Sequence, residues 1–254
     1  MFFRSLPHFI TNAICGFIPG VARRKKVRAV LNSPFVAELH FVRRCTPEHI
    51  RRVRVFVGFM ARSLIISAND KYVFKFPLKR ADYRELAVRE KRVVDALAPY
   101  STIYTPSVEL LRNGDDIVRK YDFVPGRGMR TFSAEMILKH KTKLARQIAK
   151  FIFEIASVDP VEIRDLKPSP DAKPGYAYGW FQGDIVDNFM IDPKTMNITA
   201  FIDWEDCAFR DFSEIFHTEY RSPQRELMDA VRHEYDALYK SGGKRAHRVK
   251  ANAK

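Results

Sequence analysis

Three oxygen-bearing side chains, Asp184, Asn188 and Asp203, carry the most informative chemistry in the chain. Asn188 opens the apolar run 189–191, and Asp203 closes a second apolar run, 198–202. Two apolar runs joined by a turn predict a β-hairpin, with the three side chains near one of its ends. A carboxylate there could accept a proton from a hydroxyl. An amide and a second carboxylate could hold Mg²⁺, which prefers oxygen ligands. Phosphoryl transfer requires this set of groups.

The segment 182–205 resembles the catalytic region of the aminoglycoside phosphotransferase family, which has a protein-kinase-like fold. That family reads roughly HGDLHPGN, then a short strand–turn–strand, then IDWE. The matching residues here are 182–184, Asn188 and 202–205. The resemblance implies that Asp184 is the catalytic Asp and that Asn188 and Asp203 are the metal ligands.

Two residues depart from the family pattern. Gln182 stands where the family usually has His, and the spacing from Asp184 to Asn188 is one residue shorter than is usual in the family. The short spacing leaves Asp187 open as an alternative metal ligand. A polar hairpin with a chance DxxxN motif is the competing interpretation, but the other kinase-like parts occur in the expected order along the chain.

The residues upstream predict three strands, at 53–58, 63–67 and 71–77. The turn at 68–70, Ala-Asn-Asp, has the residue types of a hairpin turn. Gly58 lies between the first two strands, where the main chain could approach a phosphate, and Ser63 could assist. A single Gly is much less than the glycine-rich loop that kinases use.

Lys75 lies on the third predicted strand and resembles the kinase Lys that binds the α- and β-phosphates. Its alternative is an outward-facing charge. Apolar residues at helical spacing predict a helix over 83–98. Glu90 on this helix resembles the Glu that pairs with the phosphate-binding Lys. Glu85 is the second candidate, and a solvated partner of a neighbouring Lys or Arg is the other explanation for Glu90.

A strand is predicted at 116–126, ending in Pro-Gly, and it resembles the kinase hinge. The resemblance implies that the backbone around Tyr121 and Phe123 binds the purine of ATP. Apolar residues then recur at helical spacing through 133–158, with Ser133 as the N-cap. This helix resembles the family helix that precedes the catalytic loop.

The composition fits a folded, cytoplasmic protein. The 254 residues are 46% hydrophobic, which is enough for a real core, and no apolar stretch reaches the roughly 20 residues that span a bilayer. Three widely spaced cysteines, Cys15, Cys45 and Cys207, indicate neither a disulfide framework nor a zinc site. The net charge is +14, but no RNA- or DNA-binding motif accompanies it, so nucleic acid is not an expected partner.

The N-terminal residues 1–35 combine an apolar stretch with the basic cluster 23–28. Pro7, His8 and Asn12 interrupt the apolar stretch and no cleavage site follows it, so a signal peptide is rejected. Two interpretations stay open: an amphipathic segment on the anionic inner face of the cytoplasmic membrane, or a helix packed on the small lobe. The segment is also similar to the N-termini of some bacterial surface-glycan enzymes.

Together these features predict an α+β, two-lobed protein-kinase-like fold. The expected parts are an N-terminal segment (1–35), an N-lobe of antiparallel strands and one helix with the hinge (36–126), a mainly helical C-lobe (127–240) and a disordered basic tail (241–254). The expected cofactors are ATP and Mg²⁺.

The expected reaction is transfer of the γ-phosphoryl group to a hydroxyl. The favoured acceptor is a sugar of a bacterial surface glycolipid, such as the lipopolysaccharide core, because a basic surface suits an anionic acceptor. A choline or ethanolamine kinase, or another small-molecule kinase of the family, is the first alternative. A catalytically impaired, pseudokinase-like nucleotide-binding module is the alternative of another class.

Overall fold

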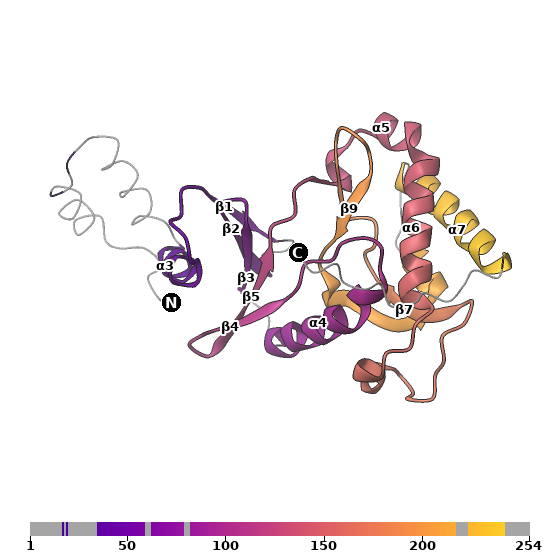
Figure 1. The fold of residues 1–254 in the computed structure, drawn as a ribbon, viewed down its shortest axis with the longest axis horizontal. Coiled ribbons are helices and arrows are strands. Elements are labelled where there is room, and N and C mark those ends of the chain that lie inside the picture. The colour runs from indigo at the N-terminus through magenta and orange to yellow at the C-terminus, as the bar shows by residue number, and fades with distance from the viewer. Residues whose placement is uncertain are drawn as a thin grey trace. The chain divides into compact units, whose positions relative to one another are not determined.

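The structure is a computed structural model that describes residues 17, 19, 35–58, 62–78, 82–216 and 223–241 (Figure 1). The predicted membrane segment and nearly all of the predicted basic tail lie outside the described residues. The chain divides into two compact units. Unit 1 comprises residues 1–80 and 112–118, and unit 2 comprises residues 81–111 and 119–254. The expected domain boundaries at residues 35, 126 and 240 stay predictions.

The elements of unit 1 are α3 (Val36–Cys45), β1 (Val53–Val57), β2 (Ser63–Ala68) and β3 (Tyr72–Pro77). Strands β4 (Glu109–Asn113) and β5 (Asp116–Asp122) complete a five-stranded sheet in the order β1-β2-β3-β5-β4. The three strands predicted at its start are confirmed, and both of their pairings are antiparallel. Asn69 and Asp70 turn the chain between β2 and β3 with φ of 56° and 53°. Asn and Asp tolerate this left-handed backbone, which suits a tight hairpin.

Helix α3 was not anticipated, so the expectation of one helix in residues 36–126 is wrong. Only Phe41 and Val42 of this helix are buried, too few apolar residues to produce a clear helical period. The ring of Phe41 packs edge-on against Phe76 of β3, with centroids 5.7 Å apart. Thr46 ends the helix, and its hydroxyl donates a hydrogen bond to the carbonyl of Val42 (2.7 Å). Packing against the sheet, rather than a strong amphipathic pattern, therefore holds α3.

Unit 2 contains the remaining elements. Its α-helices are α4 (Tyr83–Leu97), α5 (Ala134–Lys139), α6 (Lys141–Ala156) and α7 (Gln224–Lys240). Its strands are β6 (Arg127–Gly128), β7 (Tyr178–Gln182), β8 (Phe189–Ile191), β9 (Ile198–Phe201) and β10 (Cys207–Asp211). Short 3₁₀ turns are η2 (Ala98–Tyr100), η3 (Met129–Thr131), η4 (Val161–Leu166), η5 (Trp204–Asp206) and η6 (Phe212–Phe216). The strands form a three-stranded sheet, β6-β8-β9, and a two-stranded sheet, β10-β7.

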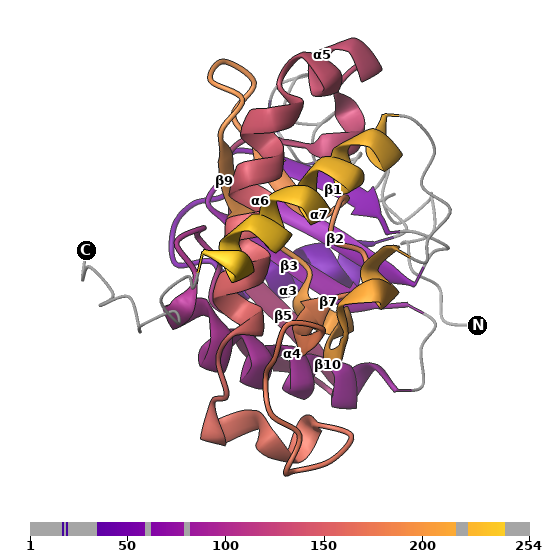
Figure 2. The ribbon, with the colours of Figure 1, turned by 90° about the vertical axis from the view of Figure 1, so that its right-hand side faces the viewer.

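Helix α6 lies at the centre of the unit 2 core. Figures 1 and 2 both show it beside α7. The side chain of Phe151 is fully buried, and its ring lies within 6 Å of the rings of Phe189, Phe201 and Trp204. These three residues belong to β8, β9 and η5, so one helix side chain fixes both strands of the predicted hairpin. Aromatic pairs of this kind contribute beyond their buried area.

The predicted helix over 133–158 is two helices. Ser133 caps α5 as expected, because its hydroxyl accepts a hydrogen bond from the backbone N–H of Met136 (3.2 Å). His140 then leaves helical geometry at φ −106° and ψ 13°, and α6 begins after it. Ile137 and Leu144 are both buried on either side of the break. Their spacing of seven residues continues the apolar period across it, so the period could not reveal the interruption.

Gly179 marks a close approach between the end of α6 and strand β7. A β-carbon at this position would lie 2.5 Å from the carbonyl oxygen of Ala156 and 2.8 Å from its side chain. Such distances are far below van der Waals contact, so only Gly fits here. Strand β7 therefore lies directly against the helix end and leads into the turn that holds Asp184.

No helix among the described residues is both long enough and apolar enough to cross a membrane.

Candidate active site

A tight turn at 183–188 presents Asp184 between strands β7 and β8. Ile185 and Val186 in the same turn are 0% and 1% exposed, so the turn is anchored in the core by its own side chains. Asn188 closes it, because its side-chain amide donates a hydrogen bond to the carbonyl of Asp184 (3.0 Å). The shortened spacing thus forms a defined turn, with Asp184 half-buried at its start.

The hairpin predicted from the two apolar runs is confirmed. Strands β8 and β9 are antiparallel, and Phe189 lies opposite Phe201. Beyond this pair, the N–H of Ile202 donates to the carbonyl of Asn188 (3.0 Å). The ladder therefore extends to the end of the hairpin where Asn188 and Asp203 lie, as the sequence pattern predicted.

Asp203 has an unusual backbone, with φ 61° and ψ 65°. This left-handed conformation is uncommon for a residue other than Gly and persists only where the surroundings impose it. Gln182 contributes to this constraint, since its side-chain amide donates to the carbonyl of Asp203 (3.2 Å). Gln182, which departs from the family pattern, therefore has a structural part in orienting the Asp203 turn.

Several charges act on the carboxyl of Asp184. Burial raises its pKa above the usual 3.8, and the nearby charges of Asp206 and Asp203 raise it further, while Arg130 opposes them. Arg130 also forms an ion pair with Asp187. This pairing partly neutralises Asp187, the alternative metal ligand, and so favours Asn188 for that role. The charged residues around Asp184 thus include Asp203, Asp206 and Arg130.

The structure separates the two candidate glutamates on α4. Glu90 is fully buried, whereas Glu85 is exposed. One carboxylate oxygen of Glu90 accepts a hydrogen bond from the backbone N–H of Trp204 (3.2 Å), and the other accepts one from the hydroxyl of Tyr121 (2.9 Å). Arg119 pairs with this second oxygen as well. A buried, multiply bonded carboxylate is not a solvated partner on a helix surface.

The remaining predicted nucleotide-binding residues lie in unit 1 and in the hinge strand. Lys75 of β3 is only 8% exposed, and a Lys is rarely buried unless it is paired. It is thus not an outward-facing charge. Gly58 and Ser63 close the β1–β2 turn through the bond from Gly58 N to Ser63 O (2.8 Å), while residues 59–61 lie outside the described residues. The purine-binding role of Tyr121 and Phe123 stays a prediction.

The donor set suits a metal ion that is shared with a substrate. Among the residues the structure describes, no three His, Cys, Asp or Glu side chains are arranged to hold a metal ion by themselves. Mg²⁺ in nucleotide-dependent enzymes typically takes one or two carboxylates and completes its shell with phosphates and water. One carboxylate and one amide, from Asp203 and Asn188, fit that mode of binding.

Sequence reasoning missed two arginines near this site. Arg130 lies in η3 and pairs with Asp187 of the 183–188 turn, and Arg119 of β5 is fully buried and pairs with Glu90. No motif marks either residue. The only signal for Arg119 was its place within the predicted strand at 116–126.

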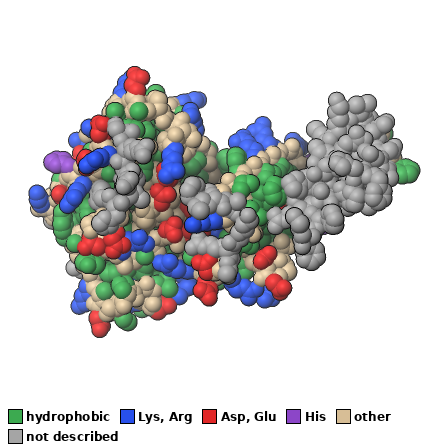
Figure 3. Space-filling model, turned by 180° about the vertical axis from the view of Figure 1, so that it is seen from behind, with side chains coloured by type: hydrophobic (Ala, Val, Ile, Leu, Met, Phe, Trp, Pro, Cys, Tyr) green, Lys and Arg blue, Asp and Glu red, His purple; other side chains and the backbone are tan. Residues whose placement is uncertain are grey.

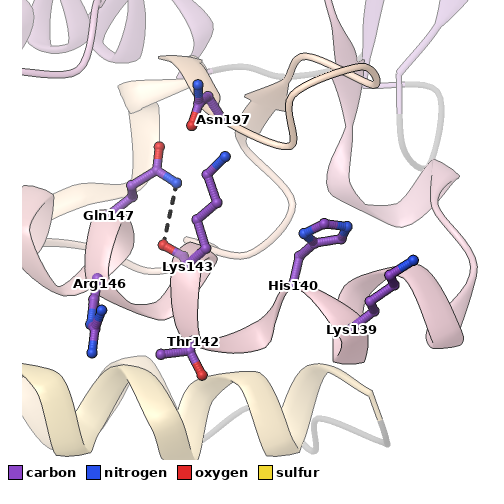
Figure 4. Close-up of a pocket in the computed structure, with 7 residues that line it drawn as sticks. All are labelled: Lys139, His140, Thr142, Lys143, Arg146, Gln147 and Asn197. Carbon is purple, nitrogen blue, oxygen red and sulfur yellow. Dashed lines mark hydrogen bonds between the residues drawn. The ribbon is translucent and has the colours of Figure 1, made fainter.

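A separate hollow of about 650 Å³ lies beside the start of α6 (Figure 4). Its lining residues are Lys139, His140, Thr142, Lys143, Arg146, Gln147 and Asn197. Lys143 donates to the carbonyl of Thr195 (2.6 Å), and Arg146 pairs with Glu234 of α7 (3.2 Å). The hollow contains none of the predicted site residues, and these two basic groups already hold the α6 surface together.

Comparisons with known proteins agree on the fold. No protein-family model matches the sequence, and no curated protein matches it. Solved structures do resemble it. The GDP and kanamycin complex of APH(2")-IIia aligns at TM-score 0.58 and 18% identity, covering 77% of this chain and 82% of that one. The streptomycin–ATP complex of APH(2")-IIa aligns at TM-score 0.58 and 13% identity, covering 81% and 85%. The apoenzyme of macrolide 2'-phosphotransferase MphH from Brachybacterium faecium aligns at TM-score 0.55 and 17% identity, covering 84% and 85%.

These alignments extend over most of both chains. The predicted α+β, protein-kinase-like fold is therefore confirmed. The resemblance noted from residues 182–205 holds at the level of the whole structure: this chain has the fold of the aminoglycoside and macrolide phosphotransferases.

Proposed function

We propose that this protein is an ATP- and Mg²⁺-dependent phosphotransferase that phosphorylates a hydroxyl group. The observation that carries the proposal is the position of Asp184. It is half-buried on a turn whose neighbouring hairpin ends in Asn188 and Asp203, within a chain that has a phosphotransferase fold. Kinase-fold enzymes need a base near the acceptor, oxygen ligands for metal, and little else from covalent chemistry.

In the proposed mechanism, Asp184 orients the acceptor hydroxyl and takes its proton. The hydroxyl oxygen forms a bond to the γ-phosphorus while the bond from that phosphorus to the β–γ bridging oxygen breaks, and ADP leaves. Burial and the charges of Asp206 and Asp203 raise the pKa of Asp184 above 3.8. A carboxylate with a raised pKa is a stronger proton acceptor.

Asn188 and Asp203 hold Mg²⁺ in this proposal, and the metal neutralises charge on the phosphates when it is bound. Lys75 grips the phosphates, with Glu90 as its partner, and Gly58 and Ser63 line the phosphate side. The backbone at Tyr121 and Phe123 binds the purine. Related folds have been solved with GDP, ADP and ATP, so the choice of ATP is tested by comparing it directly with GTP.

For the acceptor we propose a sugar hydroxyl of an anionic bacterial glycolipid, such as the lipopolysaccharide core. The net charge of +14 supports an anionic acceptor and opposes a cationic one. Figure 3 shows Lys and Arg side chains interspersed with Asp and Glu among the described residues of the visible face. The proposal therefore rests on overall charge rather than on one basic patch.

The deciding experiment is a panel of acceptors tested with purified protein, Mg²⁺ and ATP labelled on the γ-phosphate. The panel contains delipidated lipopolysaccharide core, choline, ethanolamine, kanamycin and a macrolide. Transfer of label to the core supports the proposed acceptor, and transfer to choline or ethanolamine supports the first alternative. Transfer to an antibiotic instead would place the acceptor with those of the structural relatives.

A pseudokinase-like binding module is the alternative of another class. Gln182 and the short Asp184–Asn188 spacing motivate it. Both residues nevertheless make the hydrogen bonds that order the Asp184 and Asp203 turns, which favours an active enzyme. A protein that binds nucleotide but neither hydrolyses ATP nor transfers phosphate to any acceptor of the panel would support the binding module.

Association of residues 1–35 with an anionic membrane is a separate proposal, based on the basic cluster 23–28. Binding to acidic vesicles should be measurable at low salt. It should weaken as salt shortens the screening length from roughly 30 Å at 0.01 M to about 8 Å at 0.15 M. Reversing the cluster to Glu should remove vesicle binding. If the reversed variant binds as wild type does, the cluster does not face the membrane.

A further inference from the structure

Arg119 is a fully buried arginine for which the proposed reaction has no direct use. Its side chain is 0% exposed at the start of the unit 2 part of β5. One terminal nitrogen, Nη1, contacts both the Glu90 carboxylate and the Glu205 carboxylate, the latter at 2.8 Å. Its Nε donates to the hydroxyl of Tyr83 (3.1 Å), and its guanidinium lies 4.4 Å from the centre of the same ring.

Burying these charges is costly unless they are well paired. The guanidinium of Arg119 pairs with two carboxylates here, those of Glu90 and Glu205. The other terminal nitrogen of Arg119, Nη2, has no hydrogen-bond partner among the described residues. An arrangement that is energetically unfavourable in parts is often retained because it fixes one geometry.

The geometry that it fixes lies next to Asp203. Glu205 and Trp204 follow Asp203 directly in η5. Glu90 accepts from the N–H of Trp204 (3.2 Å), and Arg119 joins Glu90 to Glu205. Helix α4 is thus connected twice to the residues after Asp203. One connection is the bond from the backbone of Trp204 to Glu90, and the other runs from Glu90 through Arg119 to the side chain of Glu205.

These connections restrain Asp203 from its C-terminal side. Gln182 provides a further restraint, because its side-chain amide donates a hydrogen bond to the carbonyl oxygen of Asp203 (3.2 Å). The left-handed backbone of Asp203 is uncommon for a residue other than Gly and needs such restraint to persist. Removing one restraint would let the residue relax toward an ordinary conformation, which would turn its carboxylate in a different direction.

We infer that Arg119 is a positioning residue: it joins Glu90 to Glu205 and thereby holds the Asp203 carboxylate in its metal-binding orientation. This inference rests on the Mg²⁺ site of the proposed function. Arg119 itself contacts neither metal nor substrate. Groups that orient metal ligands in this way typically change metal affinity by about 10–100-fold when they are removed.

The shape of the guanidinium matters as well as its charge. Arg119 reaches Tyr83, Glu90 and Glu205 at once with donors in a fixed plane. Its Nε serves Tyr83 and its Nη1 serves both carboxylates, whereas a Lys carries the same charge on one nitrogen and cannot place donors at both positions. Arg119→Lys should therefore rescue part of the effect of Arg119→Met, whereas a purely electrostatic role would be rescued completely.

The test is the affinity for nucleotide measured with and without Mg²⁺, in wild type, Arg119→Met and Arg119→Lys. The ratio of the two affinities reports the metal site, while general damage to the fold lowers both affinities alike. We expect the ratio to fall about 10-fold or more in Arg119→Met and by less in Arg119→Lys. A mutant whose two affinities fall equally would overturn the inference.

Arg92→Met is the matched control. Arg92 lies on α4 and pairs with Asp165 at 2.6 Å, but both side chains are exposed. Its loss should leave the Mg²⁺ ratio unchanged, and a fall equal to that of Arg119→Met would overturn a specific role for Arg119. If Arg119→Met does not fold, Arg119→Lys and Glu205→Gln decide the matter, because both retain the size of the side chain. An unchanged ratio in both would reject the inference.

The outcome is separable from that of the proposed function. Mg²⁺-enhanced nucleotide binding in wild type without transfer to any acceptor would refute the phosphotransferase, yet the ratios would still decide the role of Arg119. Wild type that binds nucleotide equally with and without Mg²⁺ would overturn both the metal site and this inference. An additional cycle combines Arg119→Met with Glu205→Gln. If Arg119 acts through Glu205, the double variant should be little worse than the worse single variant.

Discussion

Replacing Asp184 by Asn should lower activity and raise stability at the same time. The Asn side chain retains the size and shape of Asp but cannot accept the proton of the acceptor hydroxyl. A positioned proton acceptor contributes roughly 10²–10⁴-fold to the rate. The loss in kcat should therefore be in that range, equivalent to about 3–5 kcal/mol of transition-state stabilisation.

The predicted gain in stability follows from the pKa of Asp184, which burial raises above 3.8 together with the charges of Asp206 and Asp203, against Arg130. A raised pKa means that the folded state binds the proton more tightly than the unfolded state. The ionised carboxylate therefore lowers the free energy of unfolding at neutral pH. Each unit of pKa difference corresponds to about 1.36 kcal/mol, reduced by solvent screening because the group is half-exposed.

Asn carries no charge at any pH, so Asp184→Asn should melt at a higher temperature than wild type at pH 7. The difference should shrink as the pH falls through the raised pKa of the folded state towards 3.8, and it should vanish below 3.8, where wild type is protonated in both states. The assay is a pair of measurements on one preparation: initial rates of phosphoryl transfer, and thermal melts across pH.

Asp192→Asn is the matched control within the same hairpin. Asp192 accepts hydrogen bonds from the N–H of Lys194 (2.8 Å) and the hydroxyl of Thr195 (3.0 Å), which lower its pKa. Its charge is thus stabilising above its unfolded pKa, and its loss should lower the melting temperature and leave kcat intact. If Asp184→Asn is as active as wild type, or is less stable at pH 7, the reasoning about Asp184 is refuted.

Three further predictions concern the same unit. Asp203→Ala should weaken Mg²⁺-dependent nucleotide binding more than Asn188→Ala, since it removes a charged ligand rather than an amide dipole; titration calorimetry with Mg²⁺ tests the order, and the reverse order would contradict the assignment. The acid limb of the pH profile of kcat/KM should lie above pH 3.8, because the pKa of the Asp184 base is raised by burial and neighbouring charges; a limb at or below 3.8 would exclude Asp184 as the base. Phe151→Ala should cost about 3–5 kcal/mol of stability, because it removes a fully buried ring from three aromatic contacts. At about 2–4 °C per kcal/mol for a chain of this size, the melting temperature should fall by roughly 6–20 °C, and a fall of only a degree or two would show that the core repacks.

The sequence predicted the parts of this fold that depend on local patterns. The β8–β9 hairpin followed from two apolar runs, and the β2–β3 turn followed from Asn69 and Asp70, because each signal lies within about ten residues. Helix α4 followed from its apolar spacing for the same reason. Helix α3 was missed because only two of its residues are buried, and the break at His140 was missed because the apolar period runs across it.

The candidate site divides in the same way. Asp184, Asn188 and Asp203 were predicted because the segment 182–205 resembles a known catalytic region. Arg119 was not, because its partners lie 29 and 86 residues away in sequence. The role of Gln182 was equally hidden, since its partner Asp203 is 21 residues further on. Contacts of this kind depend on how the chain is packed, and no spacing rule describes them.

Gly179 has a consequence for experiments that score every substitution in the chain. No side chain fits between β7 and the carbonyl of Ala156, so position 179 should tolerate almost no replacement, as position 184 should. Loss of activity in such a screen would not distinguish a substitution at position 179 from one at position 184. The abundance of the protein would distinguish them. Variants at position 179 should reduce the amount of folded protein in the cell, whereas Asp184→Asn should accumulate normally but lack activity. Position 179, five residues before Asp184, should therefore be intolerant because of packing and not because of a part in the reaction.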